Sequence, residues 1–276
     1  MASKVLILIL NYKSYNLTLE LIKLLQQKLS YPNFDILVVD NASPNESGIV
    51  LANASENGRF QFFEADHNGG YASGNNIGLR YASKNNYSYV WILNNDILLA
   101  VDSDDVLDVM VEHMDSCPEL GAINPRIQFP DGSIDYEFPE RPSLYDYTFG
   151  MYSYKRRRAN YSKFNSEGII YRPQGCCMLL RVKALEDIDY LDENTFLYCE
   201  EDILAERFLA RGYFCGYCGN TAVIHNHSTT VSTTFSKLKT AQIKNKSFKY
   251  YLRTYRGFNT PALLLASSFR FLTYLR

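Results

Sequence analysis

Acidic and amide side chains directly follow two apolar runs of this 276-residue chain. The run 89–93 ends in Asn94, Asn95 and Asp96, and the run 34–39 ends in Asp40. A carboxylate placed in this way can bind a divalent cation such as Mg²⁺ or Mn²⁺, which prefers oxygen ligands and also takes phosphate oxygens. Asp and Asn are also favoured in turns and helix caps, so the local sequence leaves both interpretations of Asp96 open.

A second group of acids, Glu200, Glu201 and Asp202, precedes the apolar positions of a predicted helix. Acids are stabilised in the first turn of a helix by its dipole, and this accounts for one or two of the three. The other interpretation is that one of them faces a crevice and acts as a general base.

A third candidate stretch, 223–230, contains His225 and His227 among Ser and Thr residues. A histidine here could bind a metal or a phosphate, or could be an ordinary packed or exposed side chain. Cys215 and Cys218 form a Cys-x-x-Cys pair, but no second pair accompanies them, so we interpret this pair as structural.

The elements that must position these groups follow from hydrophobic periodicity. The continuous apolar run 4–10 predicts a strand that is covered on both faces, as in a parallel sheet. Further strands are predicted at 34–39, 61–63, 89–93 and 175–181, and helices at 16–25, 77–82, 106–114, 182–187 and 203–209. We expect 121–175, with its basic run 155–158, to form surface loops and short strands. The pattern predicts an α/β fold with an open, mostly parallel, doubly wound sheet.

Ligands of such sheets bind beyond the carboxyl ends of the strands. The predicted ends carry Asn11 and Tyr12, Asp40 and Asn41, the loop 66–70, and 94–96. The first of these turns lacks the Gly-x-Gly-x-x-Gly pattern of dinucleotide sites, and no P-loop is present. A metal-dependent nucleotidyltransferase would need a glycine-rich, basic loop there, and Tyr12–Tyr15 does not supply one. These ends favour a nucleotide held through a metal.

The charge is distributed unevenly along the chain. The net charge is -2, but no Asp or Glu follows Glu206, whereas Lys and Arg recur among Tyr, Phe and Leu from 236 to 276. Such a tail can lie on an anionic membrane surface, and the alternative is a helix packed on the body. The first residues lack a signal-peptide layout and no run of about 18 apolar residues occurs, so we expect a cytoplasmic protein.

The motifs VVDNAS, NGGYASGNN, LNND, GCCMLLR, LDENTFLYCEEDILAERFLARGY and VIHNHS occur in this order between 4 and 230. Together they resemble family 2 glycosyltransferases with the GT-A fold, and most closely the bacterial rhamnosyltransferase-like members. The resemblance implies a GT-A domain over 1–235, with 236–276 as a basic, Tyr-rich helical extension. Asn94 departs from the first acid of the family's Asp-x-Asp metal motif.

The resemblance also implies roles for particular residues. Glu201 takes the position of the catalytic base, with Glu200 and Asp202 as neighbouring candidates. Asp96 takes the position of the metal contact, and His225 that of the histidine that helps to hold the metal or diphosphate. The donor would be bound by the strand ends and the NGGYASGNN loop, with these residues implied: Asn11, Tyr12, Asp40, Asn41, Ser43, Asn68, Gly69, Asn76, Asn94 and Asn95.

The implied reaction is an inverting transfer of a sugar from a nucleoside-diphosphate sugar, such as TDP-rhamnose or a UDP-hexose, to a saccharide hydroxyl. It requires Mg²⁺ or Mn²⁺. The acceptor is expected to be lipid-linked, in polysaccharide biosynthesis at the inner face of the cell membrane, with no nucleic-acid partner. The basic run 155–158 could meet the acceptor's diphosphate or could be a solvated loop. A nucleotidyltransferase and a non-catalytic nucleotide-sugar-binding protein are the alternatives.

Overall fold

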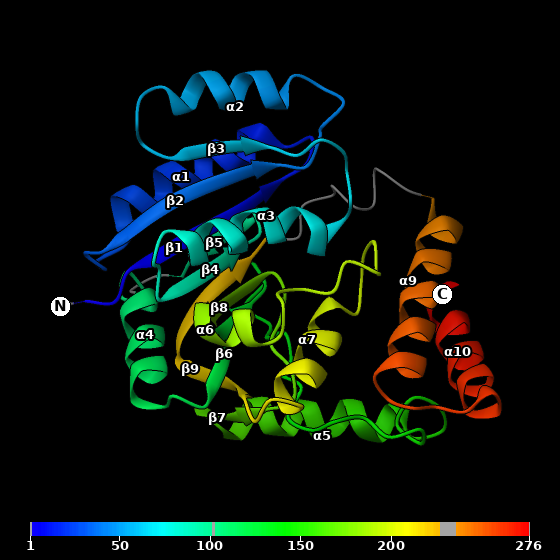
Figure 1. The fold of residues 1–276 in the computed structure, drawn as a ribbon. Helices are drawn as coiled ribbons and strands as arrows, with labels where there is room; N and C mark the ends of the chain where they lie inside the picture. The colour runs from blue at the N-terminus through cyan, green and yellow to red at the C-terminus, as the bar shows by residue number, and fades with distance from the viewer. Residues whose placement is uncertain (1, 101–102, 227–235, 276) are drawn as a thin grey trace.

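The computed structural model describes residues 2–100, 103–226 and 236–275. Its strands are β1 (Val5–Asn11), β2 (Phe34–Asp40), β3 (Gln61–Glu64), β4 (Tyr89–Leu93), β5 (Ile97–Leu99), β6 (Leu120–Gln128), β7 (Glu167–Ile170), β8 (Cys177–Arg181) and β9 (Phe214–His225). They form one sheet in the order β3-β2-β1-β4-β8-β6-β9-β5, and β7 also pairs with β9 (Figure 1).

The four strands β3, β2, β1 and β4 run parallel, as the apolar runs predict. Their register aligns Asn11 of β1 with Asp40 of β2, so these polar residues meet at one edge of the sheet. The other half of the sheet is mixed: β8 is antiparallel to β4 and β6, whereas β9 runs parallel to β6. Because β8 runs in the opposite direction, the residues that precede it reach the same edge as the end of β4.

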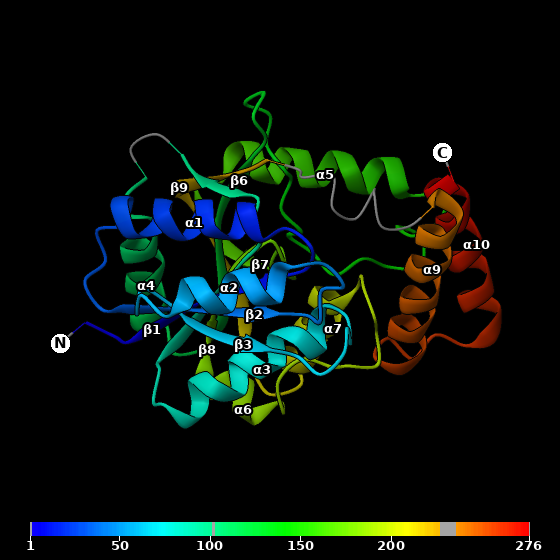
Figure 2. The same ribbon diagram turned by 90° about the horizontal axis from the view of Figure 1, so that it is seen from above.

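Helices cover both faces of the sheet (Figure 2). Buried side chains on one face come from α1 (Tyr15–Lys28), α2 (Ser47–Ser55) and α4 (Val106–Ser116), and those on the other come from α3 (Tyr71–Lys84), α6 (Val182–Asp187) and α7 (Glu200–Leu209). Alternate residues of β1 serve the two cores, with Ile7 in the first and Leu8 in the second. The doubly wound arrangement expected from the sequence is confirmed.

The expectation of surface loops over 121–175 is wrong for much of this stretch. It contains the nine-residue strand β6 and the 14-residue helix α5 (Met151–Phe164). β6 lies inside the sheet between β8 and β9, and tertiary packing there outweighs the strand-weakening Pro125. The basic run 155–158 therefore lies on a helix. The predicted loop 67–76 also ends early, because α3 begins at Tyr71.

The tail forms two helices, α9 (Lys237–Thr254) and α10 (Thr260–Leu275), which pack on each other and on the body (Figure 1). Phe248, Tyr251 and Leu252 of α9 are buried in a cluster with Tyr147 and Ile203 of the body. Ser247 and Tyr250 add hydrogen bonds to the carbonyl of Leu197 and to Asp192. These tyrosines thus pack on the body, which is the alternative to membrane contact given above.

In the described ranges, none of the helices combines the length and the hydropathy that crossing a membrane would require.

Candidate active site

The ends of β1 and β2 are joined by a buried polar network. The Asp40 carboxylate accepts hydrogen bonds from Asn11 Nδ2 at 2.6 Å, Ser43 Oγ at 2.7 Å and the Ser43 backbone N–H at 2.8 Å. Asn11 in turn accepts one from Thr18 Oγ1 at 2.8 Å. Asp40 and Asn11 are both fully buried, so this network fixes the shape of the strand ends from below. Tyr12, the next residue, is half-buried.

The turn between β4 and β5 consists of Asn94, Asn95 and Asp96. Asn95 Nδ2 donates to Ser14 Oγ at 2.8 Å and to Thr18 Oγ1 at 3.0 Å, so this turn belongs to the same network as Asp40. Asp96 Oδ1 lies 3.4 Å from Nε2 of His225, the last residue of β9. The structure therefore brings the acid and the histidine together from positions more than a hundred residues apart. His227 lies outside the described residues.

The loop before α3 crosses the end of β2. Asn41 Nδ2 donates to Asn68 Oδ1 at 3.0 Å and to the Gly70 carbonyl at 3.1 Å. Gly70 has a φ of +90°, and a Cβ there would overlap the carbonyl oxygen of Phe196. Gly69 is nearly as confined, since a Cβ there would stand 2.6 Å from the Ser73 Cβ. Gly70 lets the loop approach the segment 192–198, which leads to the acids of α7, and Gly69 lets it pack against Ser73.

Asn76 is buried within α3 and is not part of the loop that precedes this helix. It is in the second turn of α3, fully buried, and its amide bonds the Leu191 backbone at both N–H and C=O and the Glu193 carboxylate. All of these partners lie in the segment that leads to α7. Asn76 thus holds this segment in place, and its contact with the donor stays a prediction.

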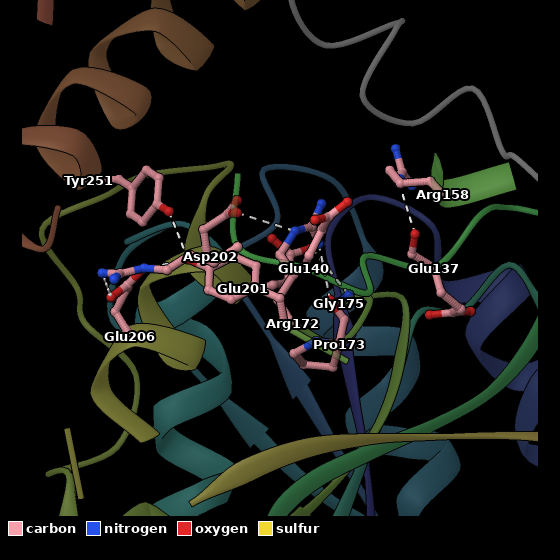
Figure 3. Close-up of polar contacts among 12 residues, drawn as sticks. Glu137, Glu140, Arg158, Arg172, Pro173, Gly175, Glu201, Asp202, Glu206 and Tyr251 are labelled. Carbon is pink, nitrogen blue, oxygen red and sulfur yellow. Dashed lines mark hydrogen bonds and ion pairs between the residues drawn. The ribbon is translucent and has the colours of Figure 1, made fainter. Parts of the chain in front are cut away.

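The start of α7 carries the three acids on a strained turn. Tyr198 and Cys199 both have positive φ, +73° and +70°, a conformation that costs a non-glycine residue about 1–3 kcal/mol. The Glu201 carboxylate then accepts a hydrogen bond from the backbone N–H of Gly175 at 3.1 Å (Figure 3). A Cβ at Gly175 would stand 2.7 Å from Glu201 Oε1, so only glycine admits the carboxylate at this distance.

The two neighbouring acids are engaged differently. Burial, and next the Glu201 carboxylate, raise the pKa of Glu200, whose side chain is 6% exposed. Asp202 pairs with Arg172 at 3.3 Å (Figure 3); burial raises its pKa, and Arg172 opposes that shift. Glu201 and Asp202 are both partly buried, and Glu201 differs from Asp202 in being held by a backbone N–H and not by an arginine.

Short contacts join the Glu201 region to the Asp96 turn. Tyr71 of α3 donates its hydroxyl to the Gly175 carbonyl at 2.6 Å, and the Asn94 backbone N–H donates to the Cys176 carbonyl at 2.9 Å. The residues 175–176 thus lie between the acid of α7 and the turn of β4. Burial, and then Glu201, raise the pKa of Tyr71 well above its ordinary value, so its hydroxyl stays a donor.

Sequence interpretation missed three participants: Tyr71, Arg172 and Gly175. Arg172 lies between aromatic and acidic groups, with its guanidinium 3.4 Å from the Phe138 ring centroid and paired with Asp202. The only local signal was the position of Gly175 directly before β8. Cys215 and Cys218 lie buried in β9 with free thiols.

The donor set at Asp96 and His225 suits a divalent cation only in part. In the described ranges no group of three or more His, Cys, Asp or Glu side chains could hold a metal ion. One carboxylate and one imidazole are nevertheless a fitting partial set, because Mg²⁺ and Mn²⁺ complete their coordination with phosphate oxygens and water.

The fold is found in solved structures. The chain matches the mannosyltransferase PcManGT from Pyrobaculum calidifontis, solved in complex with GDP-Man and Mn²⁺, with a TM-score of 0.63 and 18% identity over 100% of this chain and 72% of that chain. This likeness confirms the GT-A fold.

Sequence relatives give the family. The profile of Glycosyl transferase family 2 matches residues 6–189. The low-salt glycan biosynthesis hexosyltransferase Agl10 of Haloferax volcanii is 28% identical over 80% of this chain and 66% of its own length. The N-acetylglucosaminyl-diphospho-decaprenol L-rhamnosyltransferase of Mycobacterium tuberculosis is 27% identical over 51% of this chain and 48% of its own. The chain thus spans less than two thirds of either relative.

The chain belongs to glycosyl transferase family 2, as its motifs predict.

Proposed function

We propose that this chain is an inverting glycosyltransferase that moves a sugar from a nucleoside-diphosphate sugar to a hydroxyl of a saccharide acceptor. The observation that carries the proposal is the position of Glu201. Its carboxylate is partly exposed, is held by the Gly175 N–H at 3.1 Å, and is joined through residues 175–176 to the turn that bears Asp96. A base beside a metal-binding turn is the arrangement that a single displacement needs.

Glu201 acts as the base in this proposal. It accepts the proton of the acceptor hydroxyl while the hydroxyl oxygen bonds to the anomeric carbon, and the bond from that carbon to the diphosphate oxygen breaks with its electron pair on the diphosphate. The Gly175 N–H holds the carboxylate in place. Glu200 is buried with a raised pKa and Asp202 is paired with Arg172, so neither is as well placed to take the proton.

Asp96 and His225 would hold Mg²⁺ or Mn²⁺ together with the donor diphosphate. Such an ion, when bound, neutralises the charge of the departing diphosphate. The buried network of Asp40, Asn11 and Asn95 keeps this corner rigid, and the Asn68–Gly70 loop closes the donor side. The structure of the mannosyltransferase PcManGT, which has the same fold and was solved with GDP-Man and Mn²⁺, supports this proposal.

The donor sugar is proposed as rhamnose or a hexose, and the acceptor as a lipid-linked saccharide in cell-surface polysaccharide synthesis. The printed names of the two relatives, a glycan hexosyltransferase and a rhamnosyltransferase acting on a diphospho-decaprenol, support these classes. A lipid-linked acceptor places the protein at the inner face of the cell membrane.

The surface that would meet the membrane is formed by α10 and the chain before α5. Leu264, Leu265 and Leu272 of α10 are exposed, and Phe149, 71% exposed, packs edge-on against Phe269 at 5.0 Å between ring centroids. The exposed Lys155 and Arg156 of α5 follow along the chain. Apolar side chains next to cations are typical of surfaces that bind anionic membranes.

The deciding experiment is a thermal-shift screen of nucleotide sugars with Mn²⁺, followed by transfer assays with Glu201→Gln. We expect a nucleotide sugar to stabilise both proteins equally, and transfer by the variant to fall by about 10² to 10⁴. Glu200→Gln, a change of equal size one residue away, is the matched control and should retain most activity. If Glu201→Gln keeps its turnover, the base lies elsewhere in 200–202; if no nucleotide sugar binds the wild type, the proposal fails.

A further inference from the structure

Two cations of the C-terminal helices meet beside the turn that precedes the acids of α7. Lys244 of α9 lies 4.7 Å from the ring centroid of Tyr198 and 5.3 Å from that of Tyr274 on α10. Arg270 of α10 lies 5.3 Å from the same Tyr274 ring and donates from Nε to its hydroxyl at 3.3 Å. Tyr198 stands two residues before Glu200. The two cations therefore share one ring close to the proposed base.

Among the described residues Lys244 has no carboxylate partner, and Arg270 has only the attraction of Asp202, with which it forms no salt bridge. Over the ranges that the structure describes, neither Lys244 nor Arg270 takes part in an ion pair. The other arginines nearby are paired, Arg172 with Asp202 and Arg256 with Glu206. The helices cannot supply a counter-ion themselves, because no Asp or Glu follows Glu206 in the sequence.

Unpaired cations that are half-buried are costly to a fold, since like charges repel and each loses hydration. Burial, and then repulsion by the Arg270 guanidinium, lower the pKa of Lys244. A bound anion would remove both costs, because it pairs with the charged forms. A cation–π contact with the Tyr274 ring would by itself need only one of the two cations.

We infer that Lys244 and Arg270 bind the phosphate or diphosphate ester through which the acceptor saccharide is carried. The inference rests on the proposed function and adds a subsite to it. A phosphate held beside Tyr198 leaves the attached sugar within reach of the neighbouring Glu201. The basic run of α5 is less suited to this task, because Arg157 already pairs with Glu140 and Asp146 and Arg158 donates to backbone carbonyls.

The test measures binding of geranyl diphosphate, a soluble isoprenoid diphosphate, in EDTA so that a metal-dependent donor site does not contribute. We expect Lys244→Gln and Lys244→Met to weaken this binding by about tenfold or more, because a charge-assisted hydrogen bond is lost. Lys244→Met keeps the aliphatic contact with both tyrosine rings, and Lys244→Arg should restore binding. Geraniol, which lacks the diphosphate, should bind to wild type and all of these variants with the same affinity.

Arg253→Gln is the matched control, since it removes one exposed positive charge from the same helix away from the cluster. Equal binding of geranyl diphosphate by wild type and both neutral Lys244 variants, or equal weakening by Arg253→Gln, overturns the inference. UDP, GDP and TDP are measured on the same proteins with Mn²⁺ and without EDTA. If wild type and all variants bind one of these nucleotides, the proposed donor site is supported whatever the result at Lys244. If the wild type binds none of them, the proposed function is contradicted.

A second arm identifies the source of the phosphate. Co-sedimentation with phosphatidylglycerol vesicles should be the same for wild type and the neutral Lys244 variants. Lys244 is partly buried against Tyr198 and Tyr274 and is not part of the exposed leucine face of α10. If the variants lose vesicle binding and keep geranyl diphosphate binding, the anion is a membrane headgroup and the assignment to the acceptor is wrong.

Discussion

At the scale of residues, the site depends on which carboxylates are free to react. Three adjacent acids look alike in the sequence, but the fold gives each a different environment. Glu200 is buried, Asp202 is paired with Arg172, and Glu201 is partly buried and held by one backbone N–H. Differences in burial and pairing separate acids of the same chemical type, and these differences assign their proposed roles.

Asp96 gives a prediction about metal dependence. Asp96→Ala should remove the gain in nucleotide-sugar affinity that Mn²⁺ provides, because only one carboxylate at this turn can reach the ion. Isothermal titration with and without EDTA measures this gain. Asp105→Ala serves as the control, since it removes an exposed carboxylate that lies outside this turn. A wild-type affinity that EDTA leaves unchanged would exclude the metal role of Asp96.

At the scale of elements, a buried acid joins β6, α5 and the segment before β8. Glu137 is fully buried and accepts hydrogen bonds from Asn124 at 3.2 Å and Gln174 at 3.3 Å, while its backbone N–H donates to Ser162 Oγ at 2.7 Å. Burial raises the pKa of Glu137 from 4.5 to about 8, so the fold holds it protonated at neutral pH.

This raised pKa predicts how stability changes with pH. Above pH 4.5 the unfolded chain releases this proton while the folded chain keeps it, so the free energy of unfolding falls until the pH passes about 8. The loss amounts to at most about 5 kcal/mol. Glu137→Gln should remove this part of the pH dependence in urea titrations, whereas Glu112→Gln, at an exposed position of α4, should keep it. Parallel pH curves for Glu137→Gln and wild type would contradict the shift.

The elements were predicted unevenly. The parallel strands β1 to β4 follow from continuous apolar runs, because a strand buried on both faces can hardly contain polar residues. β6 and α5 were missed because Pro125 and the polar, basic composition of 151–164 give weak local signals. Their structure depends on packing with β8, β9 and Glu137, partners that are distant along the chain.

At the scale of the whole molecule, the tail both packs on the body and presents an apolar face. Its α9 tyrosines are buried or hydrogen-bonded to the body, so removing the tail would uncover Tyr147 and Ile203 and disturb the fold. Membrane contact therefore has to be tested with exposed residues of α10.

Leu265→Gln with Leu272→Gln should reduce co-sedimentation with anionic vesicles by about tenfold or more, because each leucine inserted into the bilayer boundary contributes about 1–2 kcal/mol. The control is Ile49→Gln on α2, which is 70% exposed on a helix at the opposite end of the molecule (Figure 1). An equal loss with Ile49→Gln, or no loss with the leucine variants, would show that α10 is not the membrane face.

The sequence by itself determined the parallel half of the sheet, the family and the residues at the strand ends. These depend on local hydrophobic pattern and on short motifs such as VVDNAS and LNND, which are visible without a fold. Only the tertiary structure decided that Asp96 meets His225, that Gly175 holds Glu201, and that Lys244 and Arg270 share the Tyr274 ring. Apart from the Arg270–Tyr274 contact within α10, each of these contacts joins residues 26 or more positions apart. Their distance in space is set by strand order and helix packing, which no local pattern encodes.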